Sequence, residues 1–401
     1  MSEPFVVLMH IFRSLFADDL PVKILLVTGQ ALGCVNATRN FSNKGQIMTI
    51  AAMAVPGDIT TLTGGYIYDR RVLEELRNTG RDIRLIRLPD SFPFPSRQDM
   101  DAALSALQNL PETWPVIIDG LAFGAMETAG VARITAPIVA LVHHPLALES
   151  GLPDAQQQHL WQTERNNLRH AAQILVPSPH TRAILIERYD VPSDKIHIAL
   201  PGIVQPQAET VAKARLHGPP LLLSVGILHP RKGHDVLIDA LALISDLDWH
   251  AKIVGIPWEE GHLEGLQDRI TRAGLDERLH LAGRISDMEL DRLYRQARIF
   301  ALATRYEGYG IVFNEALVHG LPIVSCRTGA VPDTVPPDAG LLVERDNPVA
   351  FADALRTLLT QPERYHAMAA AAGQFGSGLT TWGETARVAG VALDAAVRGR
   401  R

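Results

Sequence analysis

Two glutamates that flank a glycine-rich turn are the residues of this sequence best placed to do chemistry. Glu307 and Glu315 are separated by seven residues, and Gly308 and Gly310 lie in the turn that follows the first of them. Glycines carry no Cβ, so a ligand can approach the backbone closely. Ionised carboxylates accept strong hydrogen bonds, and one glutamate on each side of the turn can hold two different sets of sugar hydroxyls. The segment therefore predicts a binding site for a sugar.

The elements around this turn add a place for phosphate. The pattern predicts a strand that ends near Ala303 and a helix that begins near Ile311. The first turn of a helix offers unpaired N–H groups and the positive end of the helix dipole, which suit a phosphate. Helical side chains tilt toward the N-terminus, so Glu315 can point back to the same opening.

A basic pair follows another predicted strand. Arg231 and Lys232 lie in the loop between Gly226 and Gly233, directly after the apolar run 221–225. Open α/β sheets bind their ligands at the carboxyl ends of their strands. Arginine offers phosphate oxygens a bidentate fork, and lysine offers them a point charge. We expect the pair to neutralise a diphosphate leaving group.

These loops need parallel sheets to position them. Short apolar runs that are not polar at alternate positions predict strands buried on both faces, and longer amphipathic stretches between them predict helices. This βαβ pattern stops and then restarts, which predicts an α/β fold of two Rossmann-like domains facing across a cleft. The predicted strands lie at 50–55, 116–118, 138–142 and 174–176, and then at 221–225, 251–254, 299–302 and 323–325.

A segment bearing proline and glycine, residues 201–220, separates the two series and serves as the linker. We place the first domain at 47–203, the second at 204–380, and a last helix at 381–401 that packs back on the first domain. Residues 1–46 fit the pattern poorly, and we expect an extension outside the core fold, with Met48 as an alternative start.

Composition excludes several classes of function. The chain has 401 residues and a net charge of −6, which argues against binding to a nucleic-acid backbone. Cys34 and Cys326, the two cysteines, form no zinc-binding cluster and fit a reducing, cytoplasmic setting. The early apolar run 5–12 is too short to span a bilayer, so any membrane contact is expected to be peripheral.

The motifs together resemble those of the retaining glycosyltransferases of family 4. The order and spacing of five segments agree with that family, and the resemblance covers roughly residues 48–398. It implies the GT-B fold, with a nucleotide-sugar donor bound mainly by the second domain. The five segments are 226–233, 283–287 with Tyr294, 307–315, 320–324 and 340–343.

The resemblance assigns roles to matching positions. It implies that Glu307 contacts the transferred sugar, that Glu315 contacts the ribose, and that Arg231 and Lys232 grip the diphosphate. Many members carry arginine directly after the first glycine of the basic loop, where this chain has Ile227. The other implied donor-binding positions are Gly64, Gly65, Gly226, Arg284, Ile285, Gly308, Tyr309 and Gly310.

Two strand ends of the first domain supply further candidates. His143 and His144 follow a buried strand, and one of them is expected to contact the sugar or the acceptor, with His143 placed among the catalytic residues. Asp119 ends another strand, at a position near which family members often carry a histidine. Asp119 and His144 are the candidates for contact with the acceptor.

We therefore predict a retaining glycosyltransferase that moves a sugar from a nucleotide-diphosphate donor to a hydroxyl acceptor by front-face displacement. No cofactor or metal is expected, because no Asp-x-Asp motif lies beside the predicted diphosphate site. A glycosidase would leave the glycine turn and the basic pair without a role. A nucleotide-sugar epimerase of the same fold, or a non-catalytic nucleotide-sugar-binding partner, stays open as an alternative.

Overall fold

The computed structural model describes residues 26–28, 31–33, 50–149, 151–206, 218–258 and 261–399. The chain divides into two units, Met1–Ile47 and Met48–Arg401. In the first unit the description is limited to strands β1 (Leu26–Thr28) and β2 (Ala31–Gly33), which pair antiparallel. The rest of the predicted extension, residues 1–46, lies outside the described residues.

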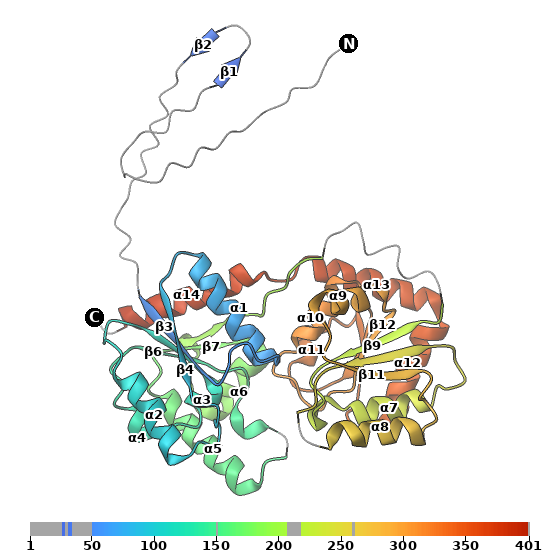
Figure 1. Cartoon of the computed structure of the whole chain (residues 1–401), viewed down its shortest axis with the longest axis horizontal. Helices are drawn as coiled ribbons and strands as arrows, with labels where there is room; N and C mark the ends of the chain where they lie inside the picture. Colours follow the sequence, from blue (N-terminus) through green and yellow to red (C-terminus); the bar gives the residue numbers. More distant parts are fainter. Residues whose placement is uncertain are drawn as a thin grey trace. The chain divides into compact units, whose positions relative to one another are not determined.

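The second unit contains two six-stranded parallel sheets with helices on their faces (Figure 1). The first sheet has the order β4-β3-β5-β6-β7-β8. Its strands are β3 (Ala51–Pro56), β4 (Ile83–Leu88), β5 (Val116–Asp119), β6 (Ile138–Leu141), β7 (Gln173–Val176) and β8 (Ile196–Ile198). Its helices are α1 (Gly64–Asn78), α2 (Arg97–Gln108), α3 (Gly120–Phe123), α4 (Thr128–Val131), α5 (Asp154–Leu168) and α6 (Pro179–Tyr189), with short 3₁₀ turns η1 (Leu146–Leu148) and η2 (Ser193–Lys195).

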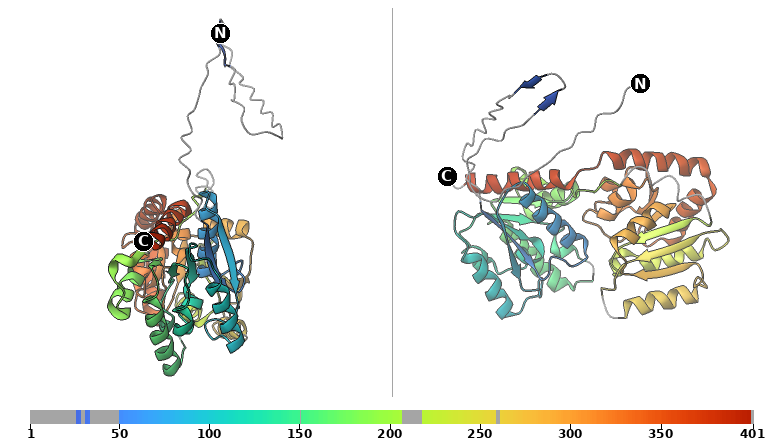
Figure 2. Two further views of the ribbon diagram at one scale, coloured as in Figure 1. Left: turned by 90° about the vertical axis from the view of Figure 1, so that its left-hand side faces the viewer. Right: turned by 45° about the horizontal axis from the view of Figure 1, so that its top comes forward.

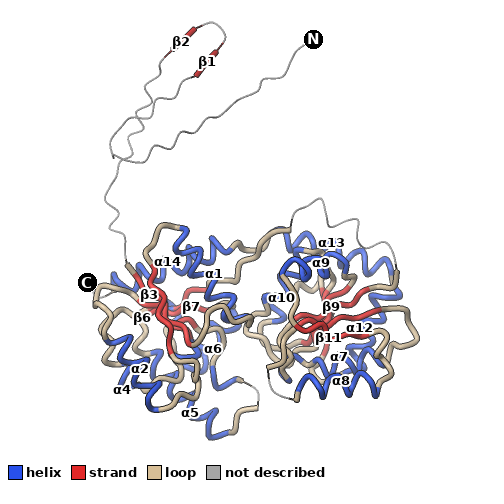
Figure 3. The backbone as a smooth tube through the Cα atoms, in the orientation of Figure 1, coloured by secondary structure: helices blue, strands red, loops and turns tan. Residues whose placement is uncertain are grey.

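The second sheet has the order β11-β10-β9-β12-β13-β14. Its strands are β9 (Leu221–Val225), β10 (His250–Val254), β11 (Leu279–Gly283), β12 (Ile299–Leu302), β13 (Ile323–Cys326) and β14 (Gly340–Val343). Its helices are η4 (Pro230–Lys232), α7 (His234–Ala242), α8 (His262–Arg272), α9 (Asp287–Gln296), α10 (Ile311–Val318), α11 (Val331–Thr334), α12 (Pro348–Thr360) and α13 (Pro362–Ser377). Figure 3 shows the strands of each sheet enclosed by helices.

The strands are apolar because both faces of each sheet are covered. In β3, Ala52 and Ala54 join one hydrophobic cluster, while Ala51, Met53 and Val55 join the cluster on the other face. All six residues of this strand are buried. Such burial on both sides is what produces the continuous apolar runs of parallel strands. The predicted α/β class and two-domain architecture are therefore confirmed.

The last helix, α14 (Trp382–Arg398), packs on the first sheet rather than on the second, although it follows the second in the chain (Figure 2). Trp382 and Leu393 share a hydrophobic cluster with Val72 of α1. Arg81, just after α1, also forms a two-point ion pair with Asp394, with both distances 2.8 Å. The first domain thus draws its core from both ends of the second unit.

Candidate functional site

A buried ion pair lies where two neighbouring strands of the second sheet end. Lys232 follows β9 and Glu307 follows β12, and β9 and β12 are paired in the sheet. The Lys232 Nζ lies 2.6 Å from Glu307 Oε1, and both residues are at least nine-tenths buried. The hydroxyl of Thr304 donates to the same carboxylate oxygen at 3.1 Å. Both predicted residues therefore meet at one point of the second domain.

Each member of the pair acts on the pKa of the other. Burial by itself would raise the pKa of Glu307, but Lys232 and Arg231 bring that pKa below its ordinary value. Burial lowers the pKa of Lys232, and the attraction of Glu307 opposes that change. An ionised carboxylate and an ammonium group at this position can bind hydroxyls and phosphate oxygens, respectively.

Arg231 lies between the two domains. Its Nη1 donates to the Tyr306 carbonyl at 2.9 Å and lies 3.8 Å from Glu307 Oε2. On its other side, Nε lies 3.2 Å from Oε1 of Glu149, which belongs to the first domain. Glu149 also contacts the His144 imidazole, with 3.1 Å between Oε2 and Nε2. A carboxylate of the first domain is therefore ion-paired with the guanidinium that is predicted to bind a diphosphate.

The glycine turn touches the first domain directly. A Cβ added at Gly308 would lie 2.6 Å from the carbonyl oxygen of His143 and 3.2 Å from the Cβ of His144. Gly310, at the start of α10, has a φ of +89°, a conformation that L side chains rarely adopt. Glycine is thus required at one position by the neighbouring backbone and at the other by the turn itself.

Glu315 has different surroundings from Glu307. Its Oε2 accepts a hydrogen bond from the Tyr294 hydroxyl at 2.7 Å, and the Tyr294 ring stacks on His319. Burial raises the pKa of Glu315, and the Tyr294 hydrogen bond opposes this only in part. The pKa values of the two glutamates of the motif are therefore shifted in opposite directions. Lys232 and Arg231 lie beside Glu307, whereas the neutral Tyr294 hydroxyl faces Glu315.

The first domain contributes a cluster of titratable groups from three elements. His143 follows β6, Asp119 ends β5 and Asp69 lies in α1. The His143 Nε2 lies 3.0 Å from Asp69 Oδ1 and 3.5 Å from Asp119 Oδ2. Among the residues with a described structure, this trio alone brings three carboxylate or imidazole ligand atoms within 4.8 Å of one another. The His143 ring nitrogen lies within hydrogen-bond distance of Asp69, so we describe the trio as a hydrogen-bonded cluster.

The remaining predicted residues follow the carboxyl ends of strands in the two sheets. Gly65, in the first turn of α1, approaches His143: a Cβ added there would be 3.4 Å from the imidazole Cδ2, whereas one at Gly64 meets nothing within 4 Å. Gly226 lies against the Lys232 side chain. Arg284 and Ile285 follow edge strand β11, and Ile285 packs on the core. The Tyr309 hydroxyl accepts a hydrogen bond from Asn314 at 2.8 Å.

Sequence reasoning missed three residues of this region. Asp69 lies four residues after Gly65, one helical turn along the same face, so the helix period could have pointed to it. Thr304 precedes Glu307 by three residues in the loop after β12. Glu149 lies beyond a 3₁₀ turn and carries no local signal, because its partner Arg231 is far away in the sequence.

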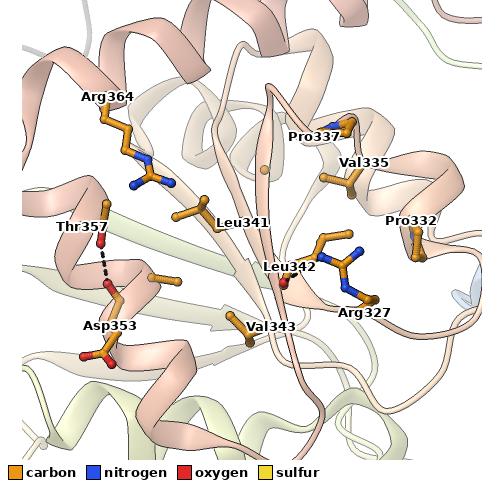
Figure 4. Close-up of a pocket in the computed structure, with 12 residues that line it drawn as sticks. Arg327, Pro332, Val335, Pro337, Leu341, Leu342, Val343, Asp353, Thr357 and Arg364 are labelled. Carbon is orange, nitrogen blue, oxygen red and sulfur yellow. Dashed lines mark hydrogen bonds between the residues drawn. The ribbon is translucent and has the colours of Figure 1, made fainter.

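Two cavities lie apart from these contacts. One of about 440 Å³ lies along edge strand β14, and Arg327, Arg364, Asp353 and Thr357 line part of it (Figure 4). None of its lining residues belongs to the predicted site. A second cavity of about 250 Å³ includes Pro230 and Arg305, and Arg305 is already paired with Asp235 at 2.8 Å. The buried charges and glycines at the domain junction therefore make the better candidate site.

Replacing Glu149 with glutamine is expected to strengthen anion binding, because Arg231 would lose a competing carboxylate. Partly exposed ion pairs contribute about 0.2–1 kcal/mol, so inorganic pyrophosphate should bind about 1.4- to five-fold more tightly. Isothermal titration calorimetry on the full chain measures this, with Glu363→Gln on the exposed start of α13 as the control. Unchanged or weaker pyrophosphate binding in Glu149→Gln would contradict the competition.

Comparison with known families matches both domains. Residues 55–204 match the domain described as Glycosyltransferase Family 4, and residues 207–375 match the one described as Glycosyl transferases group 1.

Among the residues with a described structure, no helix has the length and apolar character needed to cross a membrane.

Individual relatives are also named as enzymes that act on sugars. A D-inositol 3-phosphate glycosyltransferase of Kineococcus radiotolerans is 29% identical over 248 residues, which are 56% of this chain and 57% of the relative. A mannosylfructose-phosphate synthase of Agrobacterium fabrum is 27% identical over 172 residues, 39% of this chain and 38% of the relative. The chain thus matches 57% of the length of the first of these curated relatives and 38% of the second.

Solved structures share the fold. The sucrose-phosphate synthase of Thermosynechococcus elongatus has a TM-score of 0.72 at 20% identity, over 86% of this chain and 98% of that one. The Anabaena protein HepE, solved with UDP and glucose, has a TM-score of 0.70 at 17% identity, over 86% and 99% of the two chains.

Proposed function

Since the chain belongs to the glycosyltransferases that join a Family 4 domain to a group 1 domain, we propose that it transfers a sugar from a nucleotide-diphosphate donor to a hydroxyl acceptor. The observation that carries the proposal is the buried Lys232–Glu307 pair, with Arg231 beside it, against the first-domain loop that bears His143. Glu307 offers an acceptor for sugar hydroxyls, and Lys232 and Arg231 offer two cations for a diphosphate within 3.8 Å of that carboxylate.

We propose that transfer retains the configuration at the anomeric carbon. The bond from this carbon to the donor phosphate oxygen breaks, and the acceptor oxygen bonds to the carbon from the same face. The acceptor proton goes to the departing phosphate oxygen. Arg231, Lys232 and the first amides of α10 would stabilise the charge that develops there, which is the larger part of the barrier reduction in such sites.

In this proposal the protein's own cations, rather than a metal, neutralise the diphosphate. Glu307 would accept hydrogen bonds from the transferred sugar and Glu315 from the ribose, while Arg284 and Ile285 border the base. His143 would contact the sugar, and Asp119 and His144 would face the acceptor. A cytoplasmic location and peripheral membrane contact stay predictions from the sequence.

The activities after which the relatives are named guide the choice of substrates to test. HepE was solved with UDP and glucose, and the curated relatives are named for D-inositol 3-phosphate and for mannosylfructose phosphate. We therefore propose to test UDP-sugars first as donors, followed by GDP- and ADP-sugars, and phosphorylated polyols first as acceptors.

The test joins binding with turnover. A donor that binds the folded chain raises its apparent stability by an amount set by its concentration and affinity, so the nucleotide-sugars are first screened by thermal unfolding. The stabilising donor is then assayed for sugar transfer with the wild type and Glu307→Gln. We expect Glu307→Gln to lose at least about 100-fold in turnover, as for removal of a group that acts in the transition state.

Three outcomes would contradict the proposal. Consumption of the donor without an acceptor product would indicate an epimerase. Binding without any reaction would indicate a non-catalytic partner. Near-normal transfer by a folded Glu307→Gln variant would remove the site assignment.

A further inference from the structure

The hydrogen-bonded cluster of the first domain contains two buried carboxylates, Asp69 and Asp119, and a cation between them would reduce their repulsion. Asp69 and Asp119 are 1% and 5% exposed, so two carboxylates are buried side by side. Ionised carboxylates in contact repel each other strongly in a poorly solvated site. The His143 imidazole is the cation that lies between them, at 3.0 Å from one and 3.5 Å from the other.

The titration behaviour agrees with this geometry. Burial, with a contribution from Asp119, raises the pKa of Asp69 to about 7, although His143 acts to lower it. Burial by itself would lower the pKa of His143, but Asp69 and Asp119 raise it to about 10. The ring is therefore charged through neutral pH, and its charge is lost only as the pH rises toward 10.

The ring is also fixed in position by its neighbours. Tyr68 of α1 packs edge-on against it, with 5.1 Å between ring centroids, and Gly65 lies against its Cδ2 side. The backbone carbonyl of His143 meets Gly308 of the second domain. The side chain remains 22% exposed, so part of the imidazole stays accessible.

We propose that Asp69 is a positioning residue for the reaction: its buried carboxylate, together with that of Asp119, holds His143 as a fixed, charged hydrogen-bond donor beside the glycine turn. This inference rests on the proposed function, because His143 acts there on an oxygen of the donor sugar. Asp69 itself touches neither substrate and works through the imidazole. Its place in α1 connects that helix to the loop after β6 that bears His143.

The groups that face His143 come from every element around it. They are Asp69 and Tyr68 of α1 and Asp119 of β5, while the neighbouring His144 is turned to Glu149. Tyr68 is buried and its pKa is raised far above neutral, so it stays uncharged. The two aspartates are thus the groups whose removal would change the charge of the ring.

The test uses Asp69→Asn, which keeps the size and a hydrogen-bond acceptor but removes the charge. Glu74→Gln, on the exposed face of the same helix, is the matched control. The His143 resonance is identified by NMR as the one that disappears in His143→Gln, and its titration is followed in wild type, variant and control. In parallel, kcat/KM for transfer is measured between pH 6.5 and 8.5.

We expect the His143 resonance to titrate above pH 9 in the wild type and in Glu74→Gln, and about two pH units lower in Asp69→Asn, because one stabilising charge is gone. Transfer by Asp69→Asn should stay close to that of the wild type at pH 6.5 and fall more than about three-fold below it at pH 8.5, as the imidazolium loses its proton. A purely structural role would give the same deficit at both pH values, and that result would overturn the proposal.

Two further results separate this inference from the proposed function. A high His143 midpoint that falls in Asp69→Asn supports the positioning role of Asp69 even where no transfer is detected, since the resonance does not depend on turnover. An ordinary midpoint in an active enzyme leaves the proposed function intact and overturns this positioning role. Stoichiometric uptake of Zn²⁺ that disappears in Asp69→Asn would also overturn it, because the cluster would then hold a metal ion in place of a proton.

Discussion

Lys232→Met is expected to abolish sugar transfer and to destabilise the second domain at the same time. The substitution leaves the buried Glu307 carboxylate without the ammonium that lies 2.6 Å away. Removing one partner of a buried ion pair costs about 3–5 kcal/mol, because the other charge stays out of water. Loss of a cation at the leaving phosphate costs at least about 100-fold in turnover.

The double variant Lys232→Met/Glu307→Gln separates the two effects. Replacing both members removes the stranded charge, so most of the lost stability should return, while transfer should stay as low as in the single variant. Urea unfolding and a transfer assay on the same preparations measure both. Recovery of transfer along with stability would mean that the pair serves the fold alone, and an unchanged stability of Lys232→Met would mean that it is not buried as described.

Gly308→Ala is expected to reduce transfer about 10- to 100-fold with little change in the unfolding temperature, because misplacement of reacting groups by an ångström has effects of this size. The added Cβ would lie 2.6 Å from the His143 carbonyl oxygen, so the two loops must separate. The backbone of Gly308 does not have a positive φ, so alanine is not strained by the turn itself.

The control for this variant is Gly265→Ala in α8, where an added Cβ meets nothing within 4 Å. That change should leave transfer unchanged and add up to about 1 kcal/mol of stability, the difference in helix propensity between the two residues. Steady-state kinetics and thermal unfolding of both variants give the comparison. Wild-type kinetics in Gly308→Ala would show that contact between the two loops is not needed for turnover.

The fold class could be predicted because its strands are buried on both faces. The runs that became β3, β5, β6 and β9 are almost wholly apolar, with Asp119 and Ser224 as the polar exceptions, and this pattern is recognisable in a single sequence. The strand β4 was not predicted: it lies at the sheet edge, and Arg84 and Arg87 within it are exposed. Its mixture of apolar and charged residues reflects a strand that is partly exposed to solvent, whereas the predicted strands lie in the core.

The site could be predicted only where its residues are neighbours in the sequence. The Glu307–Glu315 motif and the basic loop are local, and both stay predictions as functional residues. The Lys232–Glu307 pairing depends on β9 lying beside β12, an order that the chain does not state. The contacts of Glu149 and Asp69 likewise arise from packing between distant segments, which a single sequence does not reveal.

The position of α14 has a consequence for how the protein is made. Trp382, Ala389 and Leu393 complete a hydrophobic cluster with β3 and α1, which are synthesised hundreds of residues earlier. During translation the N-terminal domain of a chain generally folds first. Here the first domain lacks one of its covering helices until the ribosome has produced the second domain. The apolar surface that α14 buries therefore stays exposed to solvent until that helix has been synthesised.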